Sequence, residues 1–316
     1  MLGVFSIIGW TLELGYQAVS AGPISDAADA VVTEADVFPP TGELLVLTVI
    51  HQDINIFEIL IAAADPTIDV IKKQSVRRPG ETDQEYRNRV LQQMDDSNFR
   101  AVATALRYLE IEMVPLEVVI NDIVEGVPAE KVLKLGDSIR TLNGTDIRNV
   151  EDLRASLDGL AVGDFVTITV DRTGSMLDLE IQLAENPDRP GVPMIGIIIG
   201  ELTAPPFALD IQAGDVGGPS AGLMHTLAII DTLTEGELTS GRVIAGTGTI
   251  SLDGAVGNIG SVRQKVVAAE AAGAEFMLVP EGNYQQALTA EFETIEIVPV
   301  ATLDEAIEFL QSLAAA

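Results

Sequence analysis

The chain has 316 residues, of which 47% are hydrophobic and 4% aromatic, and this provides enough apolar side chains for the cores of about two or three domains. Its 48 acidic residues far exceed its 18 basic ones, and a formal net charge of −30 repels phosphate backbones, so we expect no nucleic-acid partner. Cysteine is absent, which excludes disulfides, zinc–thiolate sites and a cysteine nucleophile. The chain has five lysines and two histidines, and a catalytic base that uses a side-chain nitrogen must be one of these residues.

The N-terminal segment, residues 1–24, begins with an apolar run from Leu2 to Leu12. This run is shorter than the roughly 18–20 apolar residues that cross a bilayer, and no Lys or Arg precedes it as in a standard signal peptide. Two interpretations remain open: a buried strand or short helix, and a shortened membrane anchor that begins upstream of Met1. No other stretch of the sequence is long and apolar enough to cross a membrane.

Residues 25–110 combine strand and helix signals in a mixed α/β region. The apolar run Leu44–Ile50 has strand propensity. Thr82 and Glu85 have capping-box spacing, and apolar residues follow at four-residue intervals, which predicts a helix that begins there. A second helix is predicted over residues 97–109, with a core-facing apolar stripe made of Phe99, Val102, Ala103, Leu106 and Leu109.

Residues 111–184 have a different, β-rich character. Runs with strand propensity alternate with the turn signals Asn143-Gly144 and Arg172-Thr-Gly174, which are typical of hairpins. The Pro- and Gly-rich segment 186–193 predicts a linker. Beyond it, residues 194–316 alternate strand-like and helix-like segments, which indicates an α/β domain. The predicted strands of the β-rich part are Leu116–Ile120, Phe165–Val170 and Leu177–Leu183.

Three motifs within residues 111–184 carry a family resemblance: Gly126-Val-Pro-Ala129, Leu133-Lys-Leu-Gly-Asp-Ser-Ile139 and Leu142-Asn-Gly144. On these residues the segment resembles a PDZ domain of the type found in bacterial proteases. PDZ domains bind an extended peptide by adding it to a sheet edge. Where a Gly-rich carboxylate-binding loop is expected, this chain has Glu112-Met-Val-Pro-Leu116, so substrate capture and a purely scaffolding function both remain open.

The motif Gly217-Gly-Pro-Ser-Ala-Gly222 precedes an apolar, helix-like segment. Its glycines permit close backbone approach, and Pro219 favours the start of a helix. Ser220 would then lie in the first helical turn, among N–H groups that lack helical acceptors and can stabilise an oxyanion. The alternatives are an ordinary capped helix and a phosphate-binding helix N-terminus. No Walker pattern occurs in the sequence, which excludes an ATP-driven machine on this chain.

A serine nucleophile requires a base, and two residues of this region are candidates. His225 follows Ser220 by five positions, which places it on a different face of the same predicted helix. Lys265 lies near the start of another predicted helix, between a plausible N-cap at Ser261 and a plausible C-terminal glycine at Gly273. Its apolar neighbours and the positive helix end disfavour the charged ammonium, and a neutral lysine can accept a hydroxyl proton.

Three segments occur in the order and at the intervals found in the proteolytic domain of Lon: Gly217–Gly222, Ala245–Gly254 and Gly260–Lys265. Residues 268–273 and Phe276–Pro280 continue the match. Residues 194–316 therefore resemble that family, which implies an α+β Lon-type proteolytic domain with the PDZ-like domain inserted before it.

The Lon resemblance also implies the residues of the site. In that family a Ser and a Lys form the catalytic dyad, which corresponds here to Ser220 and Lys265. A Thr in the strand before the Lys helix corresponds to Thr247, whose hydroxyl could orient the amine. One departure concerns the position three residues before the serine, where Lon commonly has Asp and this chain has Gly217.

The whole chain is similar to the PDZ-containing Lon-like proteases of bacteria, including Gly22-Pro23 and Pro40-Thr-Gly-Glu-Leu44 near the start. This resemblance implies polypeptide substrates, no cofactor and no metal, and a homo-oligomer such as a hexameric ring. It also implies a single N-terminal membrane anchor with the catalytic domain outside the cytoplasm.

The leading hypothesis is an ATP-independent serine endopeptidase with a Ser–Lys dyad. A non-catalytic PDZ/Lon-like protein that only captures polypeptides is the main alternative, because a fold alone does not establish an activity. A phosphate binder related to small-molecule kinases is a further alternative, which the acidity of the chain disfavours.

Overall fold

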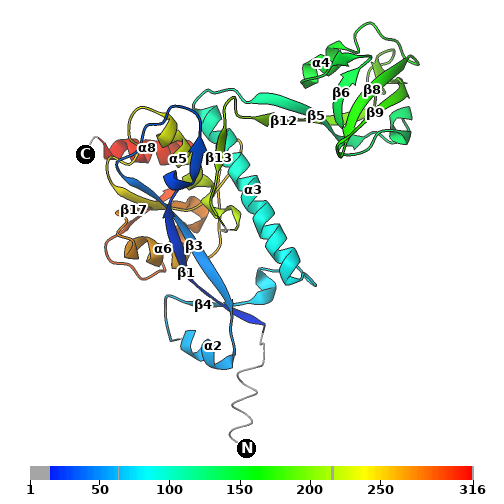
Figure 1. Ribbon diagram of the computed structural model, residues 1–316. Helices are drawn as coiled ribbons and strands as arrows, with labels where there is room; N and C mark the ends of the chain where they lie inside the picture. The colour runs from blue at the N-terminus through cyan, green and yellow to red at the C-terminus, as the bar shows by residue number, and fades with distance from the viewer. Residues whose placement is uncertain (1–14, 63, 215–216, 315–316) are drawn as a thin grey trace, which may run out of the picture. The chain divides into compact units, whose positions relative to one another are not determined.

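The computed structural model describes residues 15–62, 64–214 and 217–314. It divides into two compact units, one made of the residues up to Ile111 and from Phe207 onward, the other of Glu112–Pro206. We call them the split unit and the inserted unit (Figure 1). Most of the predicted N-terminal segment lies outside the described residues, and the described chain enters the fold at Gly15. The mixed α/β class with a β-rich inserted domain is confirmed.

One sheet organises the split unit and draws on both halves of the sequence. β14 pairs in parallel with β3 on one side and with β17 on the other, and β17 pairs in parallel with β18. β1 is antiparallel to both of its neighbours, β3 and β4. The predicted strand Leu44–Ile50 is confirmed within β3. In sheet order the strands are β18 (Glu296–Val300), β17 (Phe276–Pro280), β14 (Val243–Gly246), β3 (Glu43–Asp53), β1 (Tyr16–Asp26) and β4 (Asp69–Lys72).

Helices cover both faces of this sheet. Leu45, Ala245, Met277 and Ile297 form one row across four strands, and they belong to the core beneath α6 (Val262–Ala271). Because side chains alternate along a strand, the next row faces the other way. In that row a side chain on Gly246 would collide with Met224 of α5 (Gly222–Leu233). The helices α5 and α6 thus approach the end of β14 from opposite faces.

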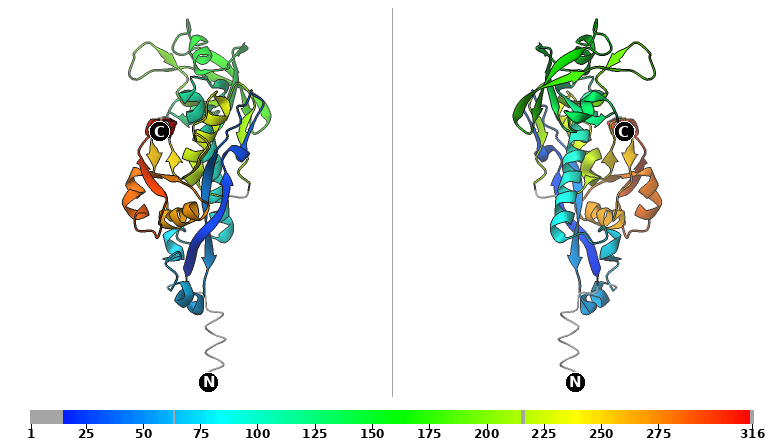
Figure 2. Two further views of the ribbon diagram at one scale, coloured as in Figure 1. Left: turned by 90° about the vertical axis from the view of Figure 1, so that its left-hand side faces the viewer. Right: turned by 90° about the vertical axis from the view of Figure 1, so that its right-hand side faces the viewer.

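A long helix, α3 (Asp83–Tyr108), packs along α5, as the side views in Figure 2 show. Its predicted capping box is present: the Thr82 side chain accepts from the Glu85 N–H, and Glu85 binds the Thr82 N–H. The prediction of two separate helices was wrong, because no Pro or Gly interrupts residues 83–108 and Ser97 is buried within one continuous helix. Phe99 of the predicted core stripe is half exposed, whereas Val102 and Leu106 are buried.

Shorter elements complete the split unit around this sheet. They are β2 (Val31–Thr33) paired with β13 (Leu209–Ile211), β15 (Thr249–Ile250) paired with β16 (Val256–Gly257), and the helices α2 (Ile56–Ala62), α7 (Tyr284–Ala287) and α8 (Leu303–Leu313). No helix in the described ranges is long and apolar enough to cross a bilayer.

The inserted unit is built around its own sheet, with the strand order β12-β5-β6-β8-β9. The predicted turns are confirmed: Asn143-Gly144 connects β6 to β7, Thr173-Gly174 connects β8 to β9, and all four residues have positive φ. Its elements are β5 (Val114–Ile123), β6 (Ser138–Leu142), β7 (Thr145–Asp146), α4 (Val150–Ala155), β8 (Phe165–Arg172), β9 (Ser175–Gln182) and β12 (Ile197–Ala204).

The boundaries predicted on the C-terminal side of this unit differ from the structure. The segment 186–193, expected to be a linker, connects the paired strands β10 (Ala184–Glu185) and β11 (Pro193–Met194) inside the unit. β12 then pairs with β5 and completes the sheet, so the unit ends at Pro206 and not at residue 184. The sequence signal was misleading because Pro and Gly mark a turn as well as a linker.

The structure also bears on where a peptide could bind, because a carboxylate-binding loop was expected at residues 112–116. Residues 112–116 run into the start of β5, where Val114 and Pro115 pair with β12, whereas β6 pairs with β5 only at Val118 and Val119. The edge strand on this side is β12, and α4 contacts it. A peptide that extends the sheet beside α4 would pair with β12.

The ion pair between Asp137 and Arg172 should contribute to the stability of the inserted unit. The Asp137 carboxylate is 1% exposed and accepts two guanidinium bonds of 2.7 Å and the Lys134 N–H. Burial raises the pKa of Asp137, but Arg172 and the Lys134 N–H outweigh burial and hold it below its ordinary value. Asp137→Asn should therefore lower the free energy of unfolding by about 2–4 kcal/mol, because it leaves the guanidinium without its partner.

Urea denaturation of the full chain, followed by the backbone amide signals of the inserted unit, measures this loss. Asp146→Asn is the matched control, because Asp146 and Arg148 are largely exposed and 4.0 Å apart, and it should change stability by less than about 1 kcal/mol. Equal effects of the two substitutions would contradict the prediction.

Candidate active site

Ser220 lies in a short 3₁₀ turn, Pro219–Ala221, that leads directly into α5. Gly218 before it has a φ of 98°, which a side chain would strain. Two contacts from α3 hold this turn: the Gly218 N–H donates to the Val90 carbonyl (3.1 Å), and the Ser97 hydroxyl donates to the Pro219 carbonyl (3.2 Å). The turn that carries Ser220 is thus held by α3, although α3 precedes the inserted unit in the sequence and Ser220 follows it.

The same helix gives a physical reason for Gly217, where the Lon resemblance led us to expect Asp. A Cβ atom at residue 217 would collide with the Val90 side chain of α3. The space that a longer side chain needs is occupied, so the departure from the family pattern fits the packing of this chain.

Lys265 lies in the first turns of α6 and is 2% exposed, among the largest fully buried side chains of the described chain. Ser261 precedes the helix as predicted, but it has a left-handed backbone (φ 56°) and its side chain makes no capping bond, so the expected cap is absent. Gly273 follows the helix with positive φ, as predicted. Val262 and Val266 on either side of Lys265 are fully buried.

The three predicted site residues come together at the end of β14. The Lys265 Nζ lies 2.7 Å from the Ser220 Oγ and 2.8 Å from the Thr247 Oγ1. Thr247 directly follows β14, is fully buried, and its hydroxyl donates to the Ser220 carbonyl (3.1 Å). The Gly248 N–H donates to the same carbonyl (2.9 Å). A helix from each face of the sheet therefore delivers one member of a serine–amine pair to one strand end.

These contacts fix how the amine can be used. Because the Thr247 hydroxyl donates to the Ser220 carbonyl, it accepts an N–H of Lys265, and this orients the amine toward the Ser220 Oγ. Burial lowers the pKa of Lys265 to about 7, because the charged ammonium loses hydration without a carboxylate partner. A large fraction of the amine is thus neutral near neutral pH and can accept a proton.

His225 lies apart from this cluster, as its spacing predicted. It is 1% exposed within α5, and its Nδ1 pairs with the Asn98 Oδ1 of α3 (3.2 Å). Burial lowers the pKa of His225 to about 4. Its contacts are those of a structural residue in the α3–α5 interface.

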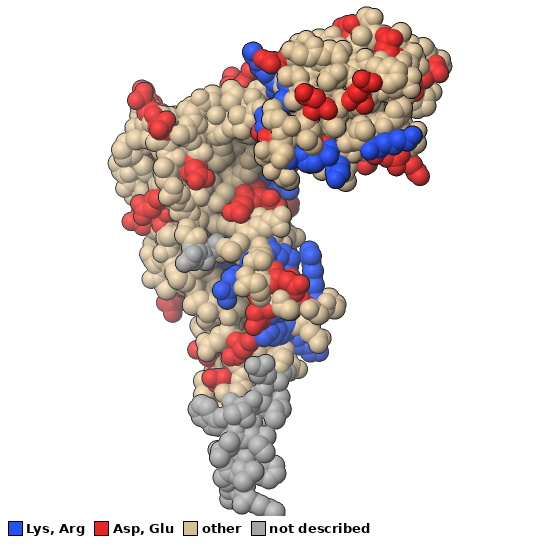
Figure 3. Space-filling view, turned by 45° about the vertical axis from the view of Figure 1, so that its right-hand side comes forward, with Lys and Arg blue, Asp and Glu red and all other residues tan. Residues whose placement is uncertain are grey.

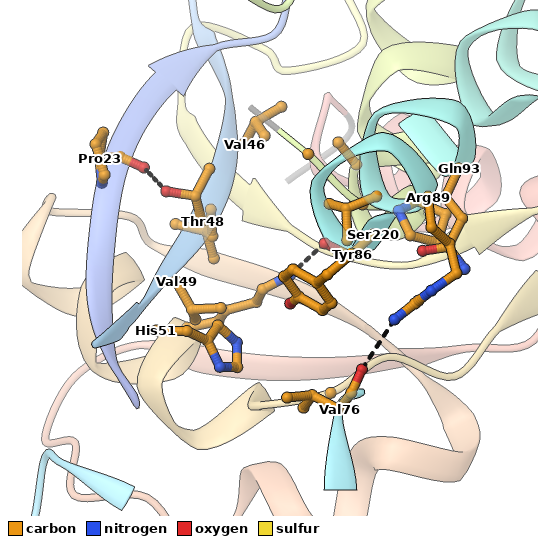
Figure 4. Close-up of a pocket in the computed structure, with 18 residues that line it drawn as sticks. Pro23, Val46, Thr48, Val49, His51, Val76, Tyr86, Arg89, Gln93 and Ser220 are labelled. Atoms are coloured by element: carbon orange, nitrogen blue, oxygen red, sulfur yellow. Dashed lines mark hydrogen bonds between the residues drawn. The ribbon is translucent and has the colours of Figure 1, made fainter. Parts of the chain in front are cut away.

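Ser220 and Lys265 open into a cleft of about 600 Å³ (Figure 4). One wall is the part of β3 that continues past the end of β14, and the opposite wall is the first half of α3. Sequence reasoning did not single out the wall residues Thr48, His51, Tyr86 and Arg89. Arg89 binds both carboxylate oxygens of Glu81 and the Val76 carbonyl, and its guanidinium stacks on the Tyr86 ring.

The wall residues had no local sequence signal, because β3 and α3 meet only in the folded unit. His51 was among the candidate bases as one of two histidines in the chain, but no motif connects it to Ser220. Its Nδ1 is buried without a hydrogen-bond partner, and burial lowers its pKa. Among the described residues, no group of three or more His, Asp or Glu side chains is arranged to hold a metal ion.

Comparisons with known proteins find two domains in the chain. The family model of the PDZ domain matches residues 92–183, and that of the Lon protease (S16) C-terminal proteolytic domain matches residues 211–312. Lon protease 2 of Bacillus subtilis (strain 168) is 36% identical over 93 residues, which are 29% of this chain and 16% of that protein. The archaeal Lon protease of Methanocaldococcus jannaschii is 38% identical over 98 residues, 31% of this chain and 14% of that protein.

The chain thus spans less than one fifth of the length of these curated relatives. Among solved structures, the PDZ domain of an SdrC-like protein from Listeria monocytogenes is 26% identical and covers 26% of this chain and 85% of that one, with a TM-score of 0.24. A solution structure from Geobacillus thermodenitrificans is 24% identical and covers 26% and 95%, with a TM-score of 0.25. On the two family models, the chain contains a PDZ domain that lies mostly in the inserted unit and a Lon C-terminal proteolytic domain in the split unit.

Proposed function

We propose that this chain is a serine endopeptidase that cleaves polypeptides with Ser220 as nucleophile and Lys265 as general base. The observation that carries the proposal is the 2.7 Å contact between the buried Lys265 Nζ and the Ser220 Oγ. A buried amine without a carboxylate is costly to maintain for stability alone, and activation of a hydroxyl by such an amine is an established form of nucleophilic catalysis.

In the proposed reaction the neutral Lys265 amine takes the Ser220 proton while the Ser220 Oγ attacks the peptide carbonyl. The N–H groups of Ser220 and Ala221, at the start of α5, are the candidates to stabilise the oxyanion. The Lys265 ammonium then gives its proton to the leaving amine, and the C–N bond breaks to leave an acyl-serine. A water molecule, deprotonated by Lys265, hydrolyses the ester and restores the Ser220 hydroxyl. Thr247 is a positioning residue that holds the amine.

The proposed hydrolysis requires no nucleotide, because acyl transfer is downhill and no Walker pattern occurs in the 316 residues. We also propose that the PDZ domain captures polypeptides, and that the free edge of β12 next to α4 is the place of capture. A hexameric ring remains a proposal that rests on the family resemblance.

For location, we propose a single N-terminal anchor with the catalytic domain outside the cytoplasm. The apolar run Leu2–Leu12 supports this proposal, as does the resemblance to the PDZ-containing Lon-like proteases. Sequencing of the gene upstream of Met1 tests it, and an in-frame basic and apolar extension is the expected result.

Removing either member of the dyad should abolish peptide cleavage. Ser220→Ala and Lys265→Ala should each lower kcat/KM for an unstructured polypeptide by at least about 10³-fold, since the attacking oxygen or its base is lost. Ser312→Ala and Lys134→Ala are matched controls on exposed surfaces and should retain full activity. A folded Ser220→Ala variant with full activity would refute Ser220 as the nucleophile, and a wild-type chain that binds the polypeptide without cleaving it would favour the alternative that the two domains only bind polypeptides.

The pH dependence of the reaction distinguishes Lys265 from either histidine. Because the amine must lose its proton, kcat/KM should rise with pH through about 7 and then level off. A reaction that used His225 would rise near pH 4 instead. We expect His225→Gln and His51→Gln to keep the midpoint near 7, and Lys265→Arg to be inactive, since a guanidinium does not deprotonate in this range. A midpoint that moves with either histidine would refute Lys265 as the base.

The low pKa of Lys265 also predicts a stability effect that needs no substrate. The folded chain releases the Lys265 proton near pH 7, whereas the unfolded chain holds it up to about pH 10.4. The unfolded state therefore binds more protons between these values, and the Lys265 contribution to the free energy of unfolding must rise as the pH increases. Below pH 7 both states are protonated and the burial penalty is fully present.

Lys265→Met removes this penalty and should stabilise the chain by at least about 1 kcal/mol at pH 6. The advantage over wild type should shrink as the pH rises from 7 to 10. Urea unfolding of wild type and variant at pH 6 and pH 9 measures the difference. A constant difference at the two pH values would show that the pKa of Lys265 is not depressed.

A further inference from the structure

The cleft runs along an open edge of β3. β14 pairs with only the first four residues of β3, which continues past the end of β14 with β1 on its other side. The Glu43 N–H points toward the β14 side, because it donates to the Arg242 carbonyl directly before that strand (3.0 Å). Backbone groups alternate along a strand, so the N–H and C=O groups of Val49 and His51 point to the same side. No other strand of the described residues pairs with them there, and this edge is open to an extended peptide.

A peptide on this edge lies in line with β14 and passes the proposed catalytic pair. β14 ends opposite Val46, and Ser220 and Lys265 meet directly beyond that strand end. His51 lies four residues beyond Leu47, the first residue of β3 past the pairing, which is about 13 Å along the strand. Residues that are opposite each other on paired strands place their side chains on one face. A substrate side chain about four residues from the cleaved bond would therefore lie beside the His51 ring.

The end of the cleft around His51 has mostly apolar walls. The chain that follows β4 reaches this end of β3, because Lys73 pairs with Asp53 at 2.7 Å. Figure 4 shows this end with the aromatic ring and the valines around the imidazole. The residues that line it are Val49, His51, Val76, Tyr86 and Arg89.

The charges at this end are already paired within the chain. The Arg89 guanidinium binds the Glu81 carboxylate at 2.7 Å and the Val76 carbonyl at 3.0 Å. Arg77, next in sequence to Val76, pairs with Asp83. Figure 3 shows the Lys and Arg side chains around the start of α3 lying among Asp and Glu side chains. A charged substrate side chain would lose its hydration here without gaining a free partner of opposite charge.

His51 brings an unused polar atom to these walls. Its Nδ1 is buried and has no hydrogen-bond partner among the described residues. Burial lowers the pKa of His51, so the ring is neutral near pH 7 and has one nitrogen that donates and one that accepts. A hydroxyl or a carboxamide can both donate and accept, and it therefore fits either tautomer of the ring. An apolar side chain would leave the buried nitrogen unsatisfied.

We propose that His51 determines the specificity of the cleft by hydrogen-bonding a Ser, Thr, Asn or Gln side chain of the substrate, about four residues from the cleaved bond. This inference rests on the proposed peptidase function and adds a preference to it. His51 is a specificity-determining residue in this proposal and takes no part in proton transfer, in agreement with Lys265 as the base.

Cleavage of defined peptides tests the preference. The full chain first cleaves a library of tryptic peptides from a denatured bacterial lysate, and mass spectrometry locates the cleaved bonds. Ser, Thr, Asn and Gln should be enriched at one position about four residues from the bond. Two synthetic peptides then carry Gln or Met at this position, and kcat/KM should be roughly 3- to 10-fold higher for the Gln peptide. A wild-type chain that cleaves the two peptides equally well would overturn the proposal.

Variants of β3 attribute the preference to the ring. His51→Leu should abolish or reverse the preference for the Gln peptide, whereas His51→Gln should keep it, because a carboxamide also donates and accepts. Gln52→Leu is the matched control, since Gln52 is an exposed neighbour on the other face of β3, and it should leave the preference unchanged. The same preference in wild type and His51→Leu, or equal losses in His51→Leu and Gln52→Leu, would also overturn the proposal.

Binding separates a failure of this proposal from a failure of the peptidase function. A wild-type chain that cleaves no peptide would refute the peptidase function, and the preference is then measured without cleavage. Fluorescein-labelled decapeptides carry Gln or Met at each position in turn, and their Kd values are measured by anisotropy on the full chain. The Gln peptide should bind roughly 3- to 10-fold more tightly at one position, and His51→Leu should remove this difference. Equal Kd values of the Gln and Met peptides at every position would overturn the role of His51.

Discussion

The burial of one amine is the constraint on which the site depends. Lys265 Nζ contacts two hydroxyl oxygens, lies among valine side chains and has no carboxylate beside it. Such an arrangement penalises the charged form, and its cost must be offset by the packing of the whole split unit. That packing includes the row Leu45, Ala245 and Met277 beneath α6, because it fixes how deep the helix lies on the sheet.

The serine depends on a second set of contacts, from the opposite face. Val90 and Ser97 of α3 bind the backbone of the turn that carries Ser220, and His225 with Asn98 joins α3 to α5 behind it. The PDZ domain is inserted in sequence between α3 and this turn. The insertion therefore leaves the site intact only because both of its ends return to the same packed unit, where residues from before and after it meet.

The cleft shows how a strand can serve two purposes. β3 pairs with β14 as far as Val46 and then continues alone on that side, so one strand supplies both the core and a wall of the cleft. The ion pair of Arg89 with Glu81 fixes the loop before α3 against the opposite wall.

The sequence alone determined the local features: the capping box at Thr82, the hairpin turns at Asn143-Gly144 and Thr173-Gly174, the strand around Leu44–Ile50 and the choice of Ser220, Thr247 and Lys265 as a set. The capping box, the turns and the strand depend on residues that are close in the chain, and local propensity is sufficient for them, whereas the choice of the three site residues followed from the resemblance to the proteolytic domain of Lon. Tertiary structure decided that β12 closes the PDZ sheet, that α3 is one helix which fixes the serine turn, and that Tyr86, Arg89 and His51 line the cleft. These outcomes depend on pairing and burial between distant segments, which no single stretch of sequence encodes.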